Sequence, residues 1–230
     1  MLSNSSIQVN PRCYKCGVTS YYLIYVFCEG ESEQAYTDFL KHKFADVAVI
    51  KRPSATGLFE EAEAKYKKDR KYISSAEVTD EIWFFFDVET KDIRKWDQRI
   101  KVINYLRKMR KNPKIRVRLL MTTGCIEYWL MLHFKMFAPS ILTETDKKRM
   151  LAEVVAVEPT YEKGDYASTA RIAERYPTAI KNAEKTLRNL ISDGLPGLED
   201  TDDRNRWLCT TCKTFSTVNE AISFLEGLER

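Results

Sequence analysis

The sequence predicts an α/β protein in which helices flank a parallel sheet and a helical region follows at the C-terminus. Short apolar runs of strand length alternate with amphipathic segments over residues 21–138, which is the pattern of a parallel sheet. After Pro139 the hydrophobic periodicity is helical. We therefore expect an N-terminal arm over 1–20, an α/β core over 21–138 and a helical region over 139–230 that packs on the core.

The expected strands are the most apolar segments of the core. The run Tyr21–Cys28 is continuously apolar and rich in β-formers, as expected of a strand that is covered on both faces. Ile82–Phe86 is the most apolar run of the chain, and shorter strands are expected at Val47–Ile50 and Ile115–Met121.

The expected helices follow these strands and then fill the C-terminal region. A serine, Ser32, can cap the helix after the first strand. The segment 126–137 is apolar on nearly every side, so it should be a buried helix. Further helices are expected over 58–72, 96–106, 167–190 and 218–228, with a charged helical segment up to Val157 and an acidic, glycine-containing loop over 193–206.

Composition limits the class of protein. The 230 residues are 44% hydrophobic, which is enough for one core with a helical annex. Because 37 basic residues are offset by 33 acidic ones, any nucleic-acid surface must be a local patch. No segment resembles a signal peptide, and no apolar stretch approaches the ~20 residues of a membrane span. We therefore expect a soluble, cytoplasmic protein with no membrane partner.

Acidic residues end the two most apolar strands. Glu29 follows the first, while Asp87 and Glu89 follow the second, two residues apart and so projecting to the same side. Ligands bind at the carboxyl ends of parallel strands, and Gly30 permits the tight turn that would bring Glu29 beside the pair. Three converging carboxylates would repel one another unless Mg²⁺ or Mn²⁺ neutralised them. Neutralising any one should then leave the metal-free protein equally or more stable. Alternatively, the acids stand there only because the chain leaves the core.

Two of these segments resemble a known type of domain. Val26–Glu33 is similar to the first TOPRIM motif and Phe84–Glu89 to the second, in which Glu89 stands where a second aspartate is usual. The resemblance implies a TOPRIM-like, Rossmann-like fold with a Mg²⁺ site, and a nuclease that cuts phosphodiester bonds.

Three later segments resemble one family more specifically. Thr123–Phe134 resembles the signature of the RloB-like proteins, with Thr123-Gly124 in place of Asn-Pro. Tyr161–Lys163 and Ala179–Ala183 are similar to that family's later segments. Membership implies a Mg²⁺-dependent endonuclease in bacterial anti-phage defence, often beside an ABC-type ATPase, with RNA such as tRNA, or DNA, as substrate. The alternative is a non-catalytic TOPRIM module that binds a nucleotide or a partner as a sensor. A homo-oligomer is left open.

Four polar residues could support the three carboxylates. The family signature implies a role near the metal for Glu127, although a helix cap is an equal alternative. Lys163 could stabilise the charge of a phosphate, or could be an ordinary surface lysine. Glu33 lies one turn after Glu29 and either reaches the metal or faces water. For His133 we expect a hydrogen-bonded core histidine rather than a general base.

A basic cluster extends from the end of one helix into the next strand. Arg116 and Arg118 alternate along the strand and so point to the same side. We expect them to be exposed and to contact the phosphate backbone of a nucleic acid. The alternative is a solvated helix end.

The six cysteines divide into pairs and single residues. Cys28 and Cys125 stand alone in apolar runs and are expected to be core residues. The other four form two C-x-x-C pairs, which is a spacing of zinc ligands. They could share a structural Zn²⁺ or be unrelated thiols, and they are Cys13, Cys16, Cys209 and Cys212.

Overall fold

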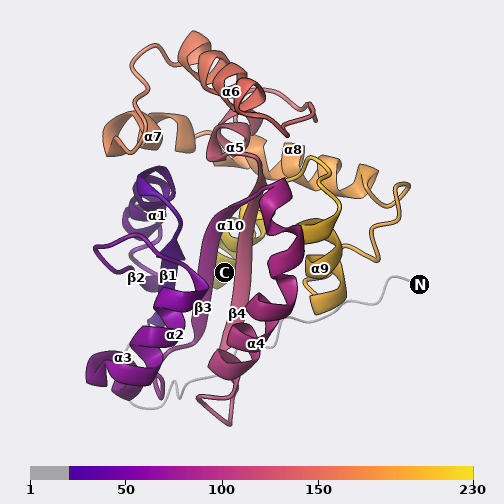
Figure 1. Ribbon diagram of the computed structural model, residues 1–230. Coiled ribbons are helices and arrows are strands. Elements are labelled where there is room, and N and C mark those ends of the chain that lie inside the picture. The colour runs from indigo at the N-terminus through magenta and orange to yellow at the C-terminus, as the bar shows by residue number, and fades with distance from the viewer. Residues whose placement is uncertain (1–20, 230) are drawn as a thin grey trace, which may run out of the picture.

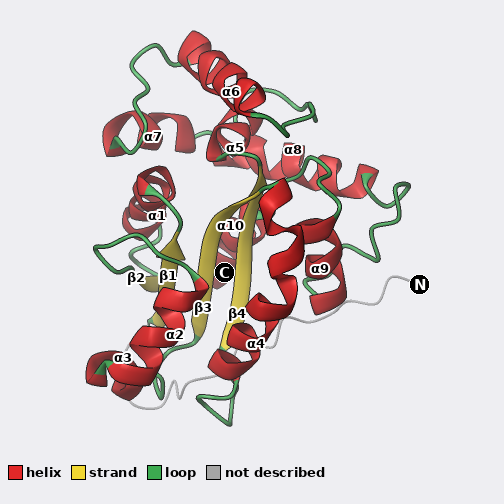
Figure 2. Ribbon diagram, viewed as in Figure 1, coloured by secondary structure: helices red, strands yellow, loops and turns green. Residues whose placement is uncertain are grey.

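The computed structural model describes residues 21–229, in which a sheet is covered by helices on both faces (Figures 1 and 2). The strands run parallel in the order β2-β1-β3-β4. They are β1 (Tyr22–Cys28), β2 (Ala48–Lys51), β3 (Glu81–Val88) and β4 (Arg116–Thr123). This arrangement confirms the predicted α/β fold with a parallel sheet.

Alternation along the strands divides the core into two halves. In β3, Trp83 and Phe85 belong to one half, whereas Ile82, Phe84 and Phe86 belong to the other. The first half is covered by α1 (Glu31–Lys43), α5 (Ile126–Leu132), α6 (Glu144–Val157), α7 (Tyr166–Ala173), α8 (Tyr176–Asn189) and α10 (Val218–Leu228). The second is covered by α2 (Phe59–Lys68), α3 (Arg70–Ser75), α4 (Trp96–Arg107) and α9 (Asp202–Thr210), with the 3₁₀ helix η1 (Thr90–Lys95) before α4.

The register of the sheet sets which residues lie together at its carboxyl end. Cys28 is opposite Phe85, and Asp87 is opposite Thr122. Because the backbone N–H of Glu29 donates to the Phe85 carbonyl at 3.0 Å, Glu29 is held beside the end of β3. Figure 1 shows α5 and α6 beyond the carboxyl ends of β3 and β4.

The outer edge of β4 is covered by a segment from the C-terminal region. Ser216 forms an antiparallel bridge with Thr122. The hydroxyl of Thr217 donates to the Leu119 carbonyl at 2.8 Å and accepts from the Met121 N–H at 2.9 Å. The edge of the sheet therefore has hydrogen-bond partners here instead of free strand groups.

Four expected segments differ in the structure. The helix expected over 58–72 is two helices, α2 and α3, because Asp69 ends the first and caps the second by accepting from Lys71 N at 2.8 Å. The helix expected over 167–190 is two helices, because Pro177 in the first turn of α8 has no N–H and cannot continue a preceding helix. The prediction of a loop over 193–206 is wrong for its last residues, which belong to α9. Thr201 caps this helix, because its hydroxyl accepts from Arg204 N at 3.2 Å. The helix expected over 126–137 ends at Leu132.

Among residues 21–229, the structure contains no helix that has both the length and the apolar character needed to cross a membrane.

Candidate active site

Glu29 and Asp87 lie side by side at the carboxyl ends of β1 and β3. The backbone N–H of Asp87 donates to Glu29 Oε2 at 2.9 Å. The turn after Glu29 also holds Glu33 close, since a Cβ added at Gly30 would lie 2.9 Å from a carboxylate oxygen of Glu33. A side chain at position 30 would therefore displace the Glu33 carboxylate from this turn.

Two further carboxylates surround Asp87 from the helices. Glu33 on α1 is 4% exposed and Glu127 on α5 is 0% exposed. Burial raises the pKa of Asp87 well above its ordinary value, and the charges of Glu33, Glu29 and Glu127 raise it further. Burial, together with the charges of Glu29 and Glu127, also raises the pKa of Glu33 to about 7. We call these four residues, Glu29, Glu33, Asp87 and Glu127, the acidic cluster.

Two buried oxygens of the acidic cluster have no hydrogen-bond partner among residues 21–229. They are Asp87 Oδ1 and Glu127 Oε2, and both are buried. A buried carboxylate oxygen without a partner loses its hydration and gains nothing in return, so native proteins rarely contain one without a reason. A ligand that supplies positive charge or hydrogen-bond donors would satisfy both atoms.

Glu127 is held from the other side by the loop before α7. Lys163 Nζ lies 3.0 Å from Glu127 Oε1, and the hydroxyl of Tyr161 donates to the same oxygen at 3.4 Å. Burial lowers the pKa of Lys163, but the charge of Glu127 outweighs this and raises it above the ordinary value. Lys163 thus lies beside the acidic cluster. Tyr161 was not expected at the site, and its only sequence signal was its place in a family segment.

Glu89 has different neighbours from Asp87. Its carboxylate pairs with Lys147 on α6 and with Lys91. Burial raises the pKa of Glu89, but these two lysines outweigh burial and hold it below its ordinary value. The structure therefore brings Glu29 and Asp87 together as expected, whereas Glu89 is paired with two lysines. The role of Glu89 as a metal ligand stays a prediction.

The acidic cluster fits a hard divalent cation by the chemistry of its donors. All its side chains are carboxylates, the ligands that Mg²⁺ and Mn²⁺ prefer, and two of their oxygens lack a partner. In the arrangement of residues 21–229, no group of three or more His, Cys, Asp or Glu side chains is positioned to hold a metal ion. Binding would require the carboxylates to move closer together.

The expectation that Arg116 and Arg118 are both exposed is wrong for Arg118. That side chain is 4% exposed and donates to both oxygens of Glu81, at 3.0 and 3.1 Å. A buried glutamate needs such a partner, which the alternation of basic residues could not reveal. Arg116 is exposed, and both arginines lie near the amino end of β4, at the other end of the strands from Asp87.

The predictions for the cysteines have different outcomes. Cys28 and Cys125 are buried core residues, as predicted. Cys13 and Cys16 lie outside the described residues. Of their proposed partners, Cys209 is buried with its Sγ 3.4 Å from Met121 Sδ, and Cys212 is partly exposed, so a shared Zn²⁺ stays a prediction.

His133 is the core histidine that the sequence predicted. It is 1% exposed, and its Nδ1 lies 3.0 Å from the Trp129 carbonyl. Because a carbonyl only accepts, Nδ1 carries the proton and Nε2 accepts from the Tyr36 hydroxyl at 3.2 Å. Both ring nitrogens of His133 are therefore engaged in hydrogen bonds within the core.

Comparison with known proteins gives one match. The family model described as RloB-like protein matches residues 24–225. The comparisons with curated proteins and with solved structures find no significant match. The matched range includes every residue of the acidic cluster and Lys163, and it covers most of the chain. The chain therefore belongs to the RloB-like family.

Proposed function

We propose that this protein is a metal-dependent nuclease that cuts phosphodiester bonds of nucleic acid at the acidic cluster. The observation that carries the proposal is the pair of unpartnered buried oxygens, Asp87 Oδ1 and Glu127 Oε2, at the carboxyl ends of parallel strands. This is where ligands bind in such sheets, and the cluster repels itself without a counterion.

The proposed Mg²⁺ or Mn²⁺ ligands are Asp87 and Glu29, with Glu33 and Glu127 beside them. A bound divalent ion would supply Lewis-acid activation of the scissile phosphate and of water. Glu127 can accept a proton, because one of its oxygens is free of partners. Lys163 is placed to offset charge that develops on the phosphate.

Three lysines near the cluster are the proposed contacts for the nucleic-acid backbone. A hollow of about 100 Å³ is lined by Lys91 and Lys147 together with Glu89. Lys163 Nζ lies 3.0 Å from Glu127 Oε1. These cations take the place that the sequence had suggested for Arg116 and Arg118. The proposal includes RNA such as tRNA, or DNA, as the substrate. It also includes a role in anti-phage defence with an ABC-type ATPase as partner. These parts rest on family resemblance.

Cleavage assays test this function directly. The purified protein is incubated with labelled tRNA, single-stranded RNA and plasmid, with and without Mg²⁺ or Mn²⁺. We expect metal-dependent cleavage that Asp87→Asn lowers by at least ~10²-fold, as expected for a group essential to the chemistry. The matched control is Asp97→Asn, at an exposed aspartate of α4, which should cut like the wild type. Equal activity of the two variants would place the chemistry elsewhere.

A non-catalytic binding module is the second candidate. It is favoured by the pairing of Glu89 with Lys147 and Lys91, since this occupies the acid that stands in the second TOPRIM motif. Calorimetric titration with Mn²⁺ separates the candidates. Metal binding that Asp87→Asn abolishes, without cleavage of any of the three substrates, would support the module and exclude the nuclease for them.

A further inference from the structure

A separate cavity lies at the amino end of β4, away from the acidic cluster. Its volume is about 430 Å³, and its walls come from β4, α8, α10 and the segment 198–200. This volume lies in the range of small-molecule sites. The walls are mostly apolar, formed in part by Leu187, Leu198 and Phe224.

One buried polar atom at this cavity has no hydrogen-bond partner within the described range 21–229. Asn219 lines the cavity, is 3% exposed, and its side-chain Oδ1 makes no hydrogen bond in the structure. A buried amide oxygen without a donor is costly, so a ligand that donates an N–H to it would gain affinity. The unsatisfied atom indicates a donor group on the ligand.

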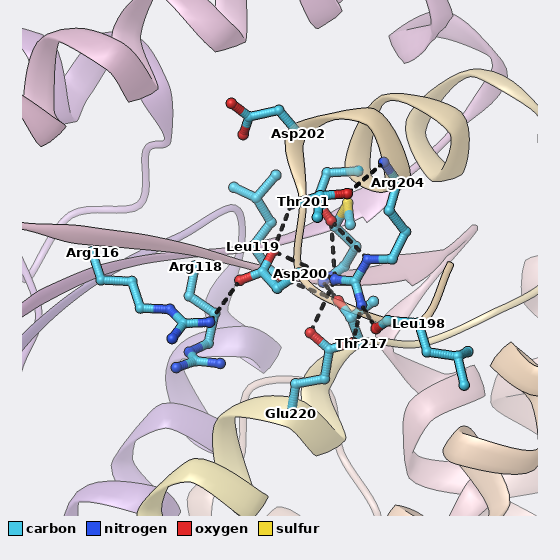
Figure 3. Close-up of polar contacts among 12 residues, drawn as sticks. Arg116, Arg118, Leu119, Leu198, Asp200, Thr201, Asp202, Arg204, Thr217 and Glu220 are labelled. Carbon is cyan, nitrogen blue, oxygen red and sulfur yellow. Dashed lines mark hydrogen bonds and ion pairs between the residues drawn. The ribbon is translucent and has the colours of Figure 1, made fainter. Parts of the chain in front are cut away.

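The charged residues deep in the cavity are already paired with one another. Arg118 is fixed by Glu81, and its guanidinium carbon lies 4.7 Å from the Phe224 ring centroid. Glu220 lines the cavity and accepts at 2.6 and 3.0 Å from Arg204, which lies outside the lining. Figure 3 shows Asp200 between Arg116 and Arg204. These pairs make the deep wall rigid and nearly neutral, which suits an uncharged ring.

The rim of the cavity offers two available cations. The side chains of Arg116 and Arg188 are 51% and 66% exposed. Their ion pairs are long, 3.4 Å to Asp200 and 3.3 Å to Glu184. Exposed pairs of this kind contribute little to stability, so both guanidinium groups can turn toward a phosphate, which they bind with two donors.

We propose that this cavity binds a nucleoside phosphate whose base carries an exocyclic amino group. The amino group donates to Asn219 Oδ1, the base lies against the apolar wall formed by Leu187, Leu198 and Phe224, and the phosphate binds Arg116 and Arg188. The proposal does not depend on the nuclease activity, because the cavity shares no residue with the acidic cluster.

Calorimetry with the full chain in EDTA tests the proposal, using ATP, ITP and inorganic triphosphate as probes. ATP and ITP differ at position 6 of the purine, where ATP carries an amino group that can donate to Asn219 Oδ1 and ITP carries a carbonyl that only accepts. We expect ATP to bind about ten-fold more tightly than ITP, a ratio typical of one satisfied buried hydrogen bond, and triphosphate to bind more weakly still. An adenosine-terminated oligonucleotide distinguishes a free nucleotide from a strand end as the source. Equal affinity for ATP, ITP and triphosphate would overturn the proposal.

Variants locate the binding. Arg116→Gln and Arg188→Gln should each weaken ATP binding about ten-fold and leave adenosine binding unchanged, because they contact only the phosphate. Lys185→Gln, at an exposed position of α8 outside the cavity, is the matched control. Asn219→Ser should remove the preference for ATP over ITP, and Asp87→Asn should leave ATP binding intact. If Asn219→Ser does not fold, the arginine variants decide: unchanged ATP binding in both would refute the site.

Discussion

Asp87 and Glu89 stand two residues apart, yet their carboxylates have opposite electrostatic surroundings. Asp87 is crowded by acids, whereas Glu89 is paired with Lys147 and Lys91. We predict that Asp87→Asn raises the melting temperature of the metal-free protein, because it relieves repulsion. Glu89→Gln should lower the free energy of unfolding by about 1 kcal/mol, because it removes the carboxylate that Lys91 and Lys147 share.

Thermal unfolding in EDTA measures both effects. This prediction differs from the equivalence that the sequence suggested for the three strand-end acids, because spacing alone could not show that lysines from α6 and η1 reach Glu89. Shifts of the same sign in the two variants would show that the acids act as a unit after all.

His133 makes stability depend on pH. Burial lowers its pKa to about 4, so the folded protein keeps it neutral where the unfolded chain, with a pKa of about 6.5, is already protonated. Its stabilising contribution is therefore complete above about pH 6.5 and is lost as the pH falls toward 4, by up to about 1.4 kcal/mol per pH unit.

We predict that the stability gap between the wild type and His133→Gln narrows over this range, because only the wild type loses free energy of unfolding by protonating this side chain. Urea denaturation at several pH values gives the gap. The chain has one other histidine, His42, which is exposed, and His42→Gln is the matched control variant. A constant gap between pH 7 and 4 would contradict the assignment.

At the scale of elements, the turn from β4 into α5 carries a steric constraint. Gly124 has φ of 76°, and a Cβ there would lie 2.3 Å from Ile141 Cγ2. We predict that Gly124→Ala destabilises the protein by more than about 2 kcal/mol, since both the backbone conformation and the contact are unfavourable. Chemical denaturation measures the change. Gly197→Ala, with nothing within 4 Å of the added Cβ, should be nearly neutral; equal losses would contradict the steric reason.

The strands were predictable because continuous apolar runs bounded by charged residues have few alternatives in a chain of this size. The ends of the helices were harder to predict than the strands. Pro177 and Thr201 carried usable signals, a missing N–H and a capping hydroxyl, that the broader helical periodicity obscured. Arg118 could not be placed from sequence, since its buried partner Glu81 lies 37 residues away.

At the scale of the whole molecule, the acidic cluster is assembled from two strand ends and two helices, with Lys163 arriving from a loop. Glu29 and Asp87 could be predicted, because the carboxyl ends of parallel strands meet at one edge of the sheet. The closeness of Glu33 and Glu127 to Asp87 depends on how α1 and α5 pack against the sheet. That packing is a long-range property, which hydrophobic periodicity does not encode.

The covered edge of β4 has a consequence for how the protein is made. Thr217, which completes the hydrogen bonding of that edge, lies 96 residues after Met121 in the chain. At a synthesis rate of about 5–20 residues per second, the ribosome needs roughly 5–20 s to supply it. Throughout that interval, β4 exposes backbone groups that could pair with another nascent chain. Assistance by chaperones would therefore matter most during this window, after the strands are complete and before the last helix emerges.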